Sequence, residues 1–164
     1  MSCCRQIDCC EVSALDTVSN KDSTCAMCGN VGKTVMKKTV VHQLKPEKFD
    51  LITNDYYWFC GTIECHIVYY AADGQTFSDE DLRNPLRVAC PERDRQVCFC
   101  FGFNQEDIKR RIESACEQPV STIINQFIKE KLCACEIRNP SGLCCLGAIY
   151  RVEKRCMGEF LDIE

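Results

Sequence analysis

The sequence predicts an α+β protein in which a strand-rich part is followed by a helical part. Short runs of β-branched and aromatic residues lie within residues 21–90, whereas apolar residues recur at helical spacing within residues 91–164. Cysteine makes up 17 of the 164 residues, a level typical of disulfide scaffolds or metal sites. Residues 1–20 form a polar, cysteine-rich segment without periodicity, which we predict to be a flexible tail.

The strand-rich part contains two predicted strands, Lys33–Val41 and Cys65–Tyr70, because both are rich in residues that favour pleated structure. Gln43–Asn54 is predicted to be a short helix with Pro46 in its first turn. Asp73-Gly74 indicates a turn, and Ser78 is suited to cap a brief helical turn over the acidic residues that follow it.

Three helices are predicted in the second part. Asn104 is suited to cap a helix that runs to about Cys116, and Ser121 to cap a second one. Asn139–Gly142 reads as a tight turn, and a third helix is expected to begin near Cys144. The predicted buried faces are Ile123, Ile124, Phe127, Ile128 and Leu132 on the second helix, and Leu146, Ile149, Tyr150 and Val152 on the third.

Composition excludes several classes of function. The net charge of −4, with no basic platform in either part, argues against a nucleic-acid partner. The longest uncharged apolar run, Ile67–Ala72, is much shorter than the roughly 20 residues that a membrane span needs. Met1–Cys10 has no apolar core of a signal peptide, so we expect a cytoplasmic protein whose thiols stay reduced. No catalytic triad, phosphate loop or nucleotide fingerprint is present, which predicts that the protein is not an enzyme.

The first cysteine constellation combines Cys25-x-x-Cys28 with a second pair, Cys60 and Cys65, 31 residues further on. Two short loops that each hold two thiolates complete a tetrahedron, which is the preferred geometry of Zn²⁺. The strand-like neighbours favour a zinc-ribbon-like arrangement with a structural zinc ion. The competing interpretation is a set of reduced cysteines in a small core. His42 and His66 are alternative ligands, but we expect both to be packing or surface histidines.

The second constellation contains three thiol pairs: Cys98-Phe-Cys100, Cys133-Ala-Cys135 and Cys144-Cys145. Four thiolates hold a [2Fe–2S] cluster, two on each iron, so a C-x-C loop followed by further pairs suits such a cluster. We expect the C-x-C loop to place its two sulfur atoms on a single iron.

These motifs carry a resemblance to a known family. Val97–Phe103, followed by Glu106–Ile108, resembles the cluster-binding motif of bacterioferritin-associated ferredoxin-like domains. Asn139–Cys145 and Tyr57–Tyr70 resemble the N-terminal half of the copper chaperone CopZ family. The resemblance implies one [2Fe–2S] cluster and one zinc ion in a cytoplasmic metal-handling protein. That family continues into a second, Cu(I)-binding domain with a C-x-x-C loop, which the 19 residues after Cys145 do not contain.

The resemblance assigns ligands residue by residue. The third cluster ligand matches Cys135 better than Cys133, and the fourth is Cys145, with its neighbour Cys144 as the alternative. The implied zinc ligands are Cys25, Cys28, Cys60 and Cys65, and the implied cluster ligands are Cys98, Cys100, Cys135 and Cys145.

The tail adds two vicinal pairs, Cys3-Cys4 and Cys9-Cys10. Soft thiolates favour soft ions such as Cu⁺, and by the same argument mercury or arsenic, so the tail is a candidate site of metal capture or delivery. The competing interpretation is a tail whose cysteines are incidental. Lys109–Arg111 is predicted to be a solvated helix face, with docking of a redox partner as the alternative.

Three functions follow from these patterns. The leading prediction is a metallochaperone-like iron–sulfur protein of copper or other soft-metal homeostasis, with metal ions and a metal-transporting or redox protein as partners. The second is electron transfer, as a small [2Fe–2S] ferredoxin that serves a reductase. The third is a zinc-only interaction module, which would be colourless.

Overall fold

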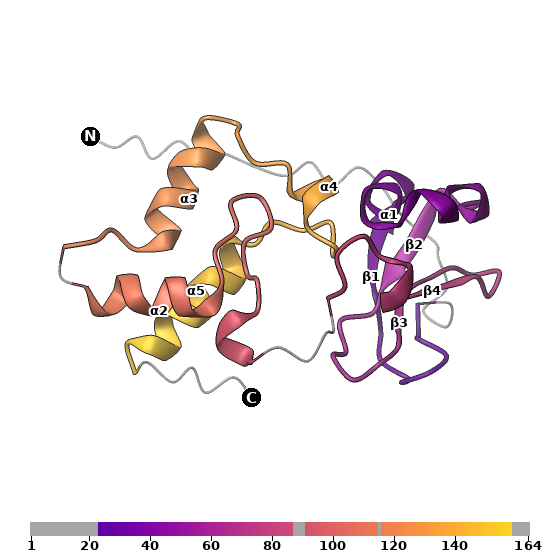
Figure 1. Ribbon diagram of the computed structural model, residues 1–164, viewed down its shortest axis with the longest axis horizontal. Helices are drawn as coiled ribbons and strands as arrows, with labels where there is room; N and C mark the ends of the chain where they lie inside the picture. The colour runs from indigo at the N-terminus through magenta and orange to yellow at the C-terminus, as the bar shows by residue number, and fades with distance from the viewer. Residues whose placement is uncertain (1–22, 87–90, 115, 159–164) are drawn as a thin grey trace, which may run out of the picture.

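The computed structural model describes residues 23–86, 91–114 and 116–158. It confirms the α+β prediction: a four-stranded antiparallel sheet occupies the first part of the chain, and the longest helices occupy the second part (Figure 1). The cysteines at positions 3, 4, 9, 10 and 90 lie outside the described residues. Within the described residues, none of the helices has both the length and the apolar character needed to span a membrane.

The sheet runs in the order β1-β2-β3-β4, with every neighbouring pair antiparallel. Alternate residues point to opposite faces of the sheet. On one face, Tyr57, Tyr69 and Phe77 join the main apolar core, and on the other, Trp58 and Tyr70 pack beside cysteines. The strands are β1 (Lys33–Met36), β2 (Tyr56–Phe59), β3 (Ile67–Tyr70) and β4 (Thr76–Ser78).

The predicted strand Lys33–Val41 is wrong in its second half, because the chain turns into helix α1 (Lys37–Gln43) after Met36. Tertiary contacts override the β-branched run there. Thr39 and Val40 are buried, and the Thr39 hydroxyl donates a hydrogen bond of 2.6 Å to the Glu136 carbonyl oxygen in the helical part. The prediction for Cys65–Tyr70 is confirmed as β3, whereas β2 and β4 were not predicted as strands.

The predicted helix over Gln43–Asn54 is a shorter 3₁₀ helix, η1 (Pro46–Leu51). Lys45 stays extended because a residue before proline disfavours the helical region. The predicted helical turn after Ser78 is confirmed as η2 (Asp79–Asp81), and Gly74 adopts a φ of +86° in the predicted turn.

Asp81 links η2 to η1, and its replacement by asparagine should destabilise the protein in a pH-dependent manner. Its carboxylate accepts hydrogen bonds from Ser78 and pairs with the Lys48 ammonium at 2.8 Å. Burial opposes ionisation, but Lys48 and Ser78 outweigh it and hold the pKa of Asp81 below its usual value. We expect Asp81→Asn to lower the free energy of unfolding by about 1–2 kcal/mol at pH 7.

The direction of this pH dependence follows from the lowered pKa of Asp81. The contribution of Asp81 to the free energy of unfolding is fully present above the carboxyl pKa of the unfolded chain. This contribution is lost as the pH falls through the pKa of Asp81 in the folded protein. Denaturant unfolding at pH 7 and at successively lower pH checks this, with Asp50→Asn as the control at an exposed carboxylate. A stability difference that stays constant down to pH 3 would contradict it.

The helical part is built around α5 (Leu146–Cys156), against which α2 (Gln105–Glu113) and α3 (Val120–Lys129) pack (Figure 1). Two short elements complete it, η3 (Glu92–Asp94) and α4 (Cys135–Arg138). Its core contains the buried side chains Ile108, Val120, Ile124, Ile149 and Val152, together with Cys98, Cys135 and Cys145.

The three predicted helices are present, but their ends and their buried faces differ from the prediction. Asn104 caps α2 as predicted, but that helix ends at Glu113. Ser121 lies inside α3 instead of capping it, and its backbone N–H donates to the buried Glu153 carboxylate at 2.8 Å. Leu132 lies beyond α3 and is 54% exposed, because Lys131 adopts a φ of 57° that turns the chain away.

Hydrogen bonds join the sheet part to the segment between α4 and α5. Gln43 Nε2 donates to the Ile137 carbonyl oxygen at 2.9 Å, and the Tyr69 hydroxyl donates to the Pro140 carbonyl oxygen at 2.7 Å. The predicted turn at Asn139–Gly142 is confirmed by a hydrogen bond of 2.8 Å from the Gly142 N–H to the Asn139 carbonyl oxygen. These contacts hold the two sets of cysteines in one folded unit.

Candidate metal centres

The first cysteine group is formed by two loops at one end of the sheet. Cys25 and Cys28 lie before β1, and Cys60 and Cys65 lie between β2 and β3. All four sulfur atoms lie within 4.8 Å of one another, with 3.7 Å between Cys25 and Cys65 and 3.6 Å between Cys28 and Cys60. Four sulfurs at about 2.3 Å from a tetrahedral Zn²⁺ would be about 3.8 Å apart, so the arrangement fits one such ion. His42 and His66 are not members of the group.

Backbone N–H groups point at these sulfur atoms. Burial raises the pKa of Cys25, and hydrogen bonds from the N–H groups of Cys28 and Met27 oppose that rise. Burial also raises the pKa of Cys65 to about 12, against a hydrogen bond from the Ile67 N–H. Clustered, partly desolvated thiols do not all ionise without a compensating cation, so a bound divalent metal would satisfy this site.

Thr62 connects the two loops. Asn30 Nδ2 donates to the Thr62 hydroxyl oxygen at 2.8 Å, and the Cys28 sulfur is hydrogen-bonded to the same hydroxyl group at 3.5 Å. This hydrogen bond, followed by one from the Asn30 backbone N–H, lowers the pKa of Cys28 to about 6. Sequence spacing alone did not identify Asn30 and Thr62, because their role depends on contact across 32 residues.

Aromatic packing fixes the first loop against the sheet. Trp58 and Tyr70 stack with ring centroids 5.7 Å apart, beside Cys25, Cys60 and Cys65. Gly32 passes so close to them that a Cβ there would lie 2.8 Å from the Trp58 Cβ and would also collide with the Tyr70 hydroxyl. The absence of a side chain at Gly32 therefore permits the approach of the cysteine loop.

The second cysteine group lies in the core of the helical part. Cys98 and Cys100 precede α2, Cys135 begins α4, and Cys145 precedes α5. The Cys100 and Cys135 sulfurs are 3.6 Å apart, and the thiols of Cys98 and Cys145 are hydrogen-bonded to each other. Cys98, Cys135 and Cys145 are buried, and Cys100 is half-buried.

The expectation that the C-x-C loop directs both sulfurs to one iron stays a prediction, and in the structure its two thiols have different neighbours. Cys98 and Cys100 contact different partners, because a tight loop separates their side chains. The Gly102 N–H donates to the Cys98 carbonyl oxygen at 2.9 Å, and Gly102 adopts a φ of +79°. The result is that Cys98 contacts Cys145 and Cys100 contacts Cys135.

Electrostatics differ between the two pairs. The hydrogen bond from Cys145 is the main reason that the pKa of Cys98 falls to about 6, and the Phe101 and Cys100 N–H groups add to it against burial. The same hydrogen bond, together with burial, raises the pKa of Cys145. Burial raises the pKa of Cys135 to about 12. The Ala134 N–H donates to the Cys100 sulfur at 3.4 Å.

The alternative ligands that the sequence left open, Cys144 or Cys145 and Cys133 or Cys135, differ in their surroundings. Cys145 is buried and contacts Cys98, whereas Cys144 is exposed. Cys135 is buried and contacts Cys100, whereas Cys133 is half-buried. Their burial and contacts therefore favour Cys145 over Cys144, and Cys135 over Cys133, as candidate ligands.

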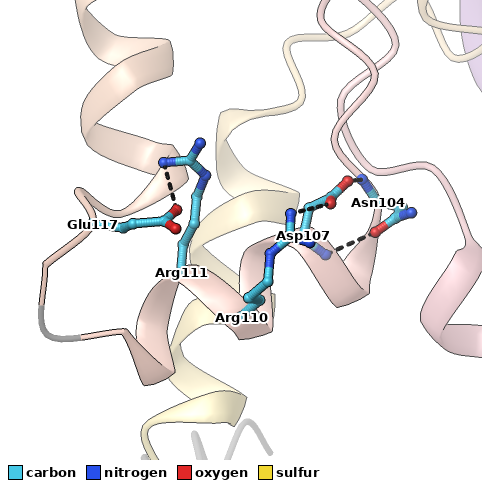
Figure 2. A network of polar contacts seen from close by, with 5 residues as sticks. All are labelled: Asn104, Asp107, Arg110, Arg111 and Glu117. Atoms are coloured by element: carbon cyan, nitrogen blue, oxygen red, sulfur yellow. Dashed lines mark hydrogen bonds and ion pairs between the residues drawn. The ribbon is translucent and has the colours of Figure 1, made fainter.

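Figure 2 shows a polar network along α2 that extends from the N-cap residue Asn104 to Glu117. Asn104 Oδ1 accepts from the Asp107 N–H at 2.8 Å, and an Asp107 oxygen accepts from the Asn104 N–H at 3.2 Å. Arg110 pairs with Asp107 at 2.9 Å, and Arg111 pairs with Glu117 at 3.1 Å while lying over the Phe103 ring. Lys109 and Arg110 are solvated as predicted, but Arg111 packs partly against the protein.

The four-cysteine group is a candidate metal site, and the domain that contains it is similar to a zinc-binding domain. Residues 22–83 match the family model of the CopZ zinc-binding domain, and this match contains Cys25, Cys28, Cys60 and Cys65.

One relative is the copper chaperone CopZ of Archaeoglobus fulgidus, to which this chain is 28% identical over 121 residues. The alignment covers 74% of this chain and 57% of that protein, so the chain matches little more than half of the length of its relative. The X-ray structure of the Archaeoglobus fulgidus CopZ N-terminal domain shares the fold, with a TM-score of 0.62 and 23% identity over 79% of this chain and 96% of that one. The predicted similarity to CopZ is thus confirmed, whereas the ferredoxin-like identity of the helical part stays a prediction.

Proposed function

We propose that this protein is a zinc- and iron–sulfur-containing metallochaperone that binds or reduces soft metal ions, copper foremost. The similarity to a copper chaperone supports metal handling over catalysis and does not favour the ferredoxin alternative. The observation that carries the iron–sulfur part is the pair of thiol contacts in the helical core, Cys98 with Cys145 and Cys100 with Cys135.

In this proposal Cys25, Cys28, Cys60 and Cys65 hold a structural zinc ion, because four thiolates leave no open coordination position. Cys98, Cys100, Cys135 and Cys145 hold a [2Fe–2S] cluster. The residues present fit that group: two close thiol pairs, donor N–H groups at the sulfurs and an apolar surround that includes Ile108 and Ile149. Such a cluster supplies a single electron, which is the difference between Cu(II) and Cu(I).

The chain's own residues have separate tasks. The backbone N–H groups of Ala134, Phe101 and Cys100 stabilise negative charge on the thiolates. Apolar packing keeps water from the sulfurs of Cys98, Cys135 and Cys145, whereas Cys100 is half-buried. The exposed Cys144 is the sequence neighbour of the buried Cys145. The tail thiols of Cys3, Cys4, Cys9 and Cys10 are proposed to capture the cargo ion, since soft ligands select Cu(I), mercury or arsenic. A metal-transporting protein is the proposed receiver.

Metal content and spectrum test this function. We expect anaerobically purified protein to be red-brown and to contain about two iron and one zinc per chain. After reduction and removal of excess reductant, the holo protein should convert added Cu(II) to Cu(I), measured with a Cu(I)-specific chelator. The holo protein with its cluster oxidised is the control, because thiols also reduce Cu(II), and the reduced protein should yield about one more Cu(I) per chain than this control. A colourless zinc-only protein that reconstitution does not convert, or a reduced holo protein that leaves Cu(II) oxidised, would contradict the proposal.

A further inference from the structure

A cleft of about 1600 Å³ lies between the sheet part and the helical part. Its walls come from the loop after β2, from residues 84–86, from residues 94–97 and from the outer side of α5. Small-molecule sites enclose roughly 300–1,000 Å³, so this cleft is large enough for a segment of polypeptide.

The cleft carries a charge opposite to that of the whole protein. Among the described residues, six lysines and arginines and a single acidic residue, Asp94, line it, although the chain has 20 basic and 24 acidic residues and a net charge of −4. Arg155 pairs with Glu92 at 3.6 Å, and the other five basic side chains form no ion pair with any residue in the described part of the chain. The six are Lys33, Arg95, Arg138, Arg151, Lys154 and Arg155.

The cleft also borders both cysteine groups. Cys60 of the first group and Cys145 of the second are among its lining residues, and each is almost fully buried. Cys144 and Leu143 line it as well, and both are exposed. A segment bound there would therefore lie against a free thiol that is adjacent to the buried Cys145.

The chain supplies a segment of matching charge, length and attachment. Residues 1–22 contain Asp8, Glu11, Asp16 and Asp22 against two basic residues. The Gly32 N–H donates to the Ser23 carbonyl oxygen at 2.8 Å, and the next residue, Lys33, lines the cleft, so the segment joins the fold at the edge of the cleft. At about 3.3 Å per residue, the 13 residues from Cys10 to Ser23 extend up to about 40 Å.

We propose that the acidic N-terminal segment, residues 1–22, binds in this basic cleft and brings Cys9 and Cys10 to Cys144. Tethering gives the segment an effective concentration in the millimolar range, so modest electrostatic attraction is sufficient. Binding itself requires no metal; its use, which rests on the proposed function, is to bring an ion captured by the tail to the second cysteine group.

Carbodiimide cross-linking of the full-length holo protein tests the proposal, because this reagent joins carboxylates directly to lysine amines. Mass spectrometry should find Asp8 and Glu11 linked to Lys154 on the far wall of the cleft at least tenfold more often than to the exposed Lys38 and Lys129. Mixing ¹⁵N-labelled and unlabelled chains should show that these links form within one chain. Sodium chloride at 0.5 M should suppress them, because the Debye length then falls to about 4 Å.

Two charge-matched variants complete the test. Arg138→Glu with Arg151→Glu should lower cross-linking to Lys154 at least tenfold, whereas Lys38→Glu with Lys129→Glu should leave it unchanged. Links no more frequent at Lys154 than at the exposed lysines, or equally reduced in both variants, would overturn the proposal and leave the cleft to a separate acidic partner. Links only between differently labelled chains would overturn it in favour of a second copy. The cross-linking readout depends on carboxylates and lysines and not on bound metal. The cleft proposal can therefore fail while the iron, zinc and copper measurements support the proposed function, and the proposed function can fail while the cross-links form as expected.

Discussion

Replacement of Cys60 by serine is expected to abolish zinc binding and to lower the melting temperature by about 10 °C or more. The Cys60 sulfur lies 3.6 Å from that of Cys28, within a buried group shared with Trp58 and Tyr70. Loss of a structural zinc site costs folding free energy directly, and we expect a loss of about 3–5 kcal/mol here. The loss is partial because the main apolar core around Tyr57 and Tyr69 is separate from the cysteine loops.

Trp58 provides a local measurement of this effect. It is the only tryptophan in the chain, is 6% exposed and packs beside the cysteines. Its emission should shift to longer wavelength in Cys60→Ser, and a strong zinc chelator should produce the same shift in the unmodified protein, reversibly on return of Zn²⁺. Cys116→Ser, at an exposed thiol outside both groups, is the matched control. One zinc per chain with an unchanged melting temperature in Cys60→Ser would contradict the assignment.

The second large effect distinguishes two adjacent cysteines. Cys145→Ser is expected to lose nearly all iron and visible absorption, whereas Cys144→Ser should retain about two iron per chain. Cys145 is 3% exposed and is hydrogen-bonded to Cys98, while Cys144 is exposed at the cleft. Anaerobic iron analysis and the visible spectrum of both variants give the result.

Cys135→Ser and Cys133→Ser form a parallel comparison on the other sulfur pair, with loss expected only for Cys135. Zinc content is the internal control, because the first cysteine group is formed by different loops. If Cys144→Ser lost its iron while Cys145→Ser kept it, the ligand assignment at this position would be reversed. If all four variants kept a full complement of iron, the cluster would lie elsewhere or be absent.

The sequence by itself predicted the class of fold and the cysteines of both candidate centres. Cys25-x-x-Cys28 and the later pair place thiols on short loops, and loop spacing of this kind limits where the sulfur atoms can lie. The caps at Ser78 and Asn104 were also predictable, because capping depends on contacts within four residues of chain.

The tertiary structure decided what depends on residues far apart in the chain. It made a helix of Lys37–Gln43, despite a β-branched run, because Thr39 and Gln43 hydrogen-bond to carbonyl groups almost one hundred residues later. It paired Cys98 with Cys145 and Cys100 with Cys135, instead of pairing the neighbours in the C-x-C loop. It also gathered six basic residues from distant segments into one cleft. Local sequence encodes turns, caps and ligand loops, whereas pairings and surfaces arise only when separate elements pack together.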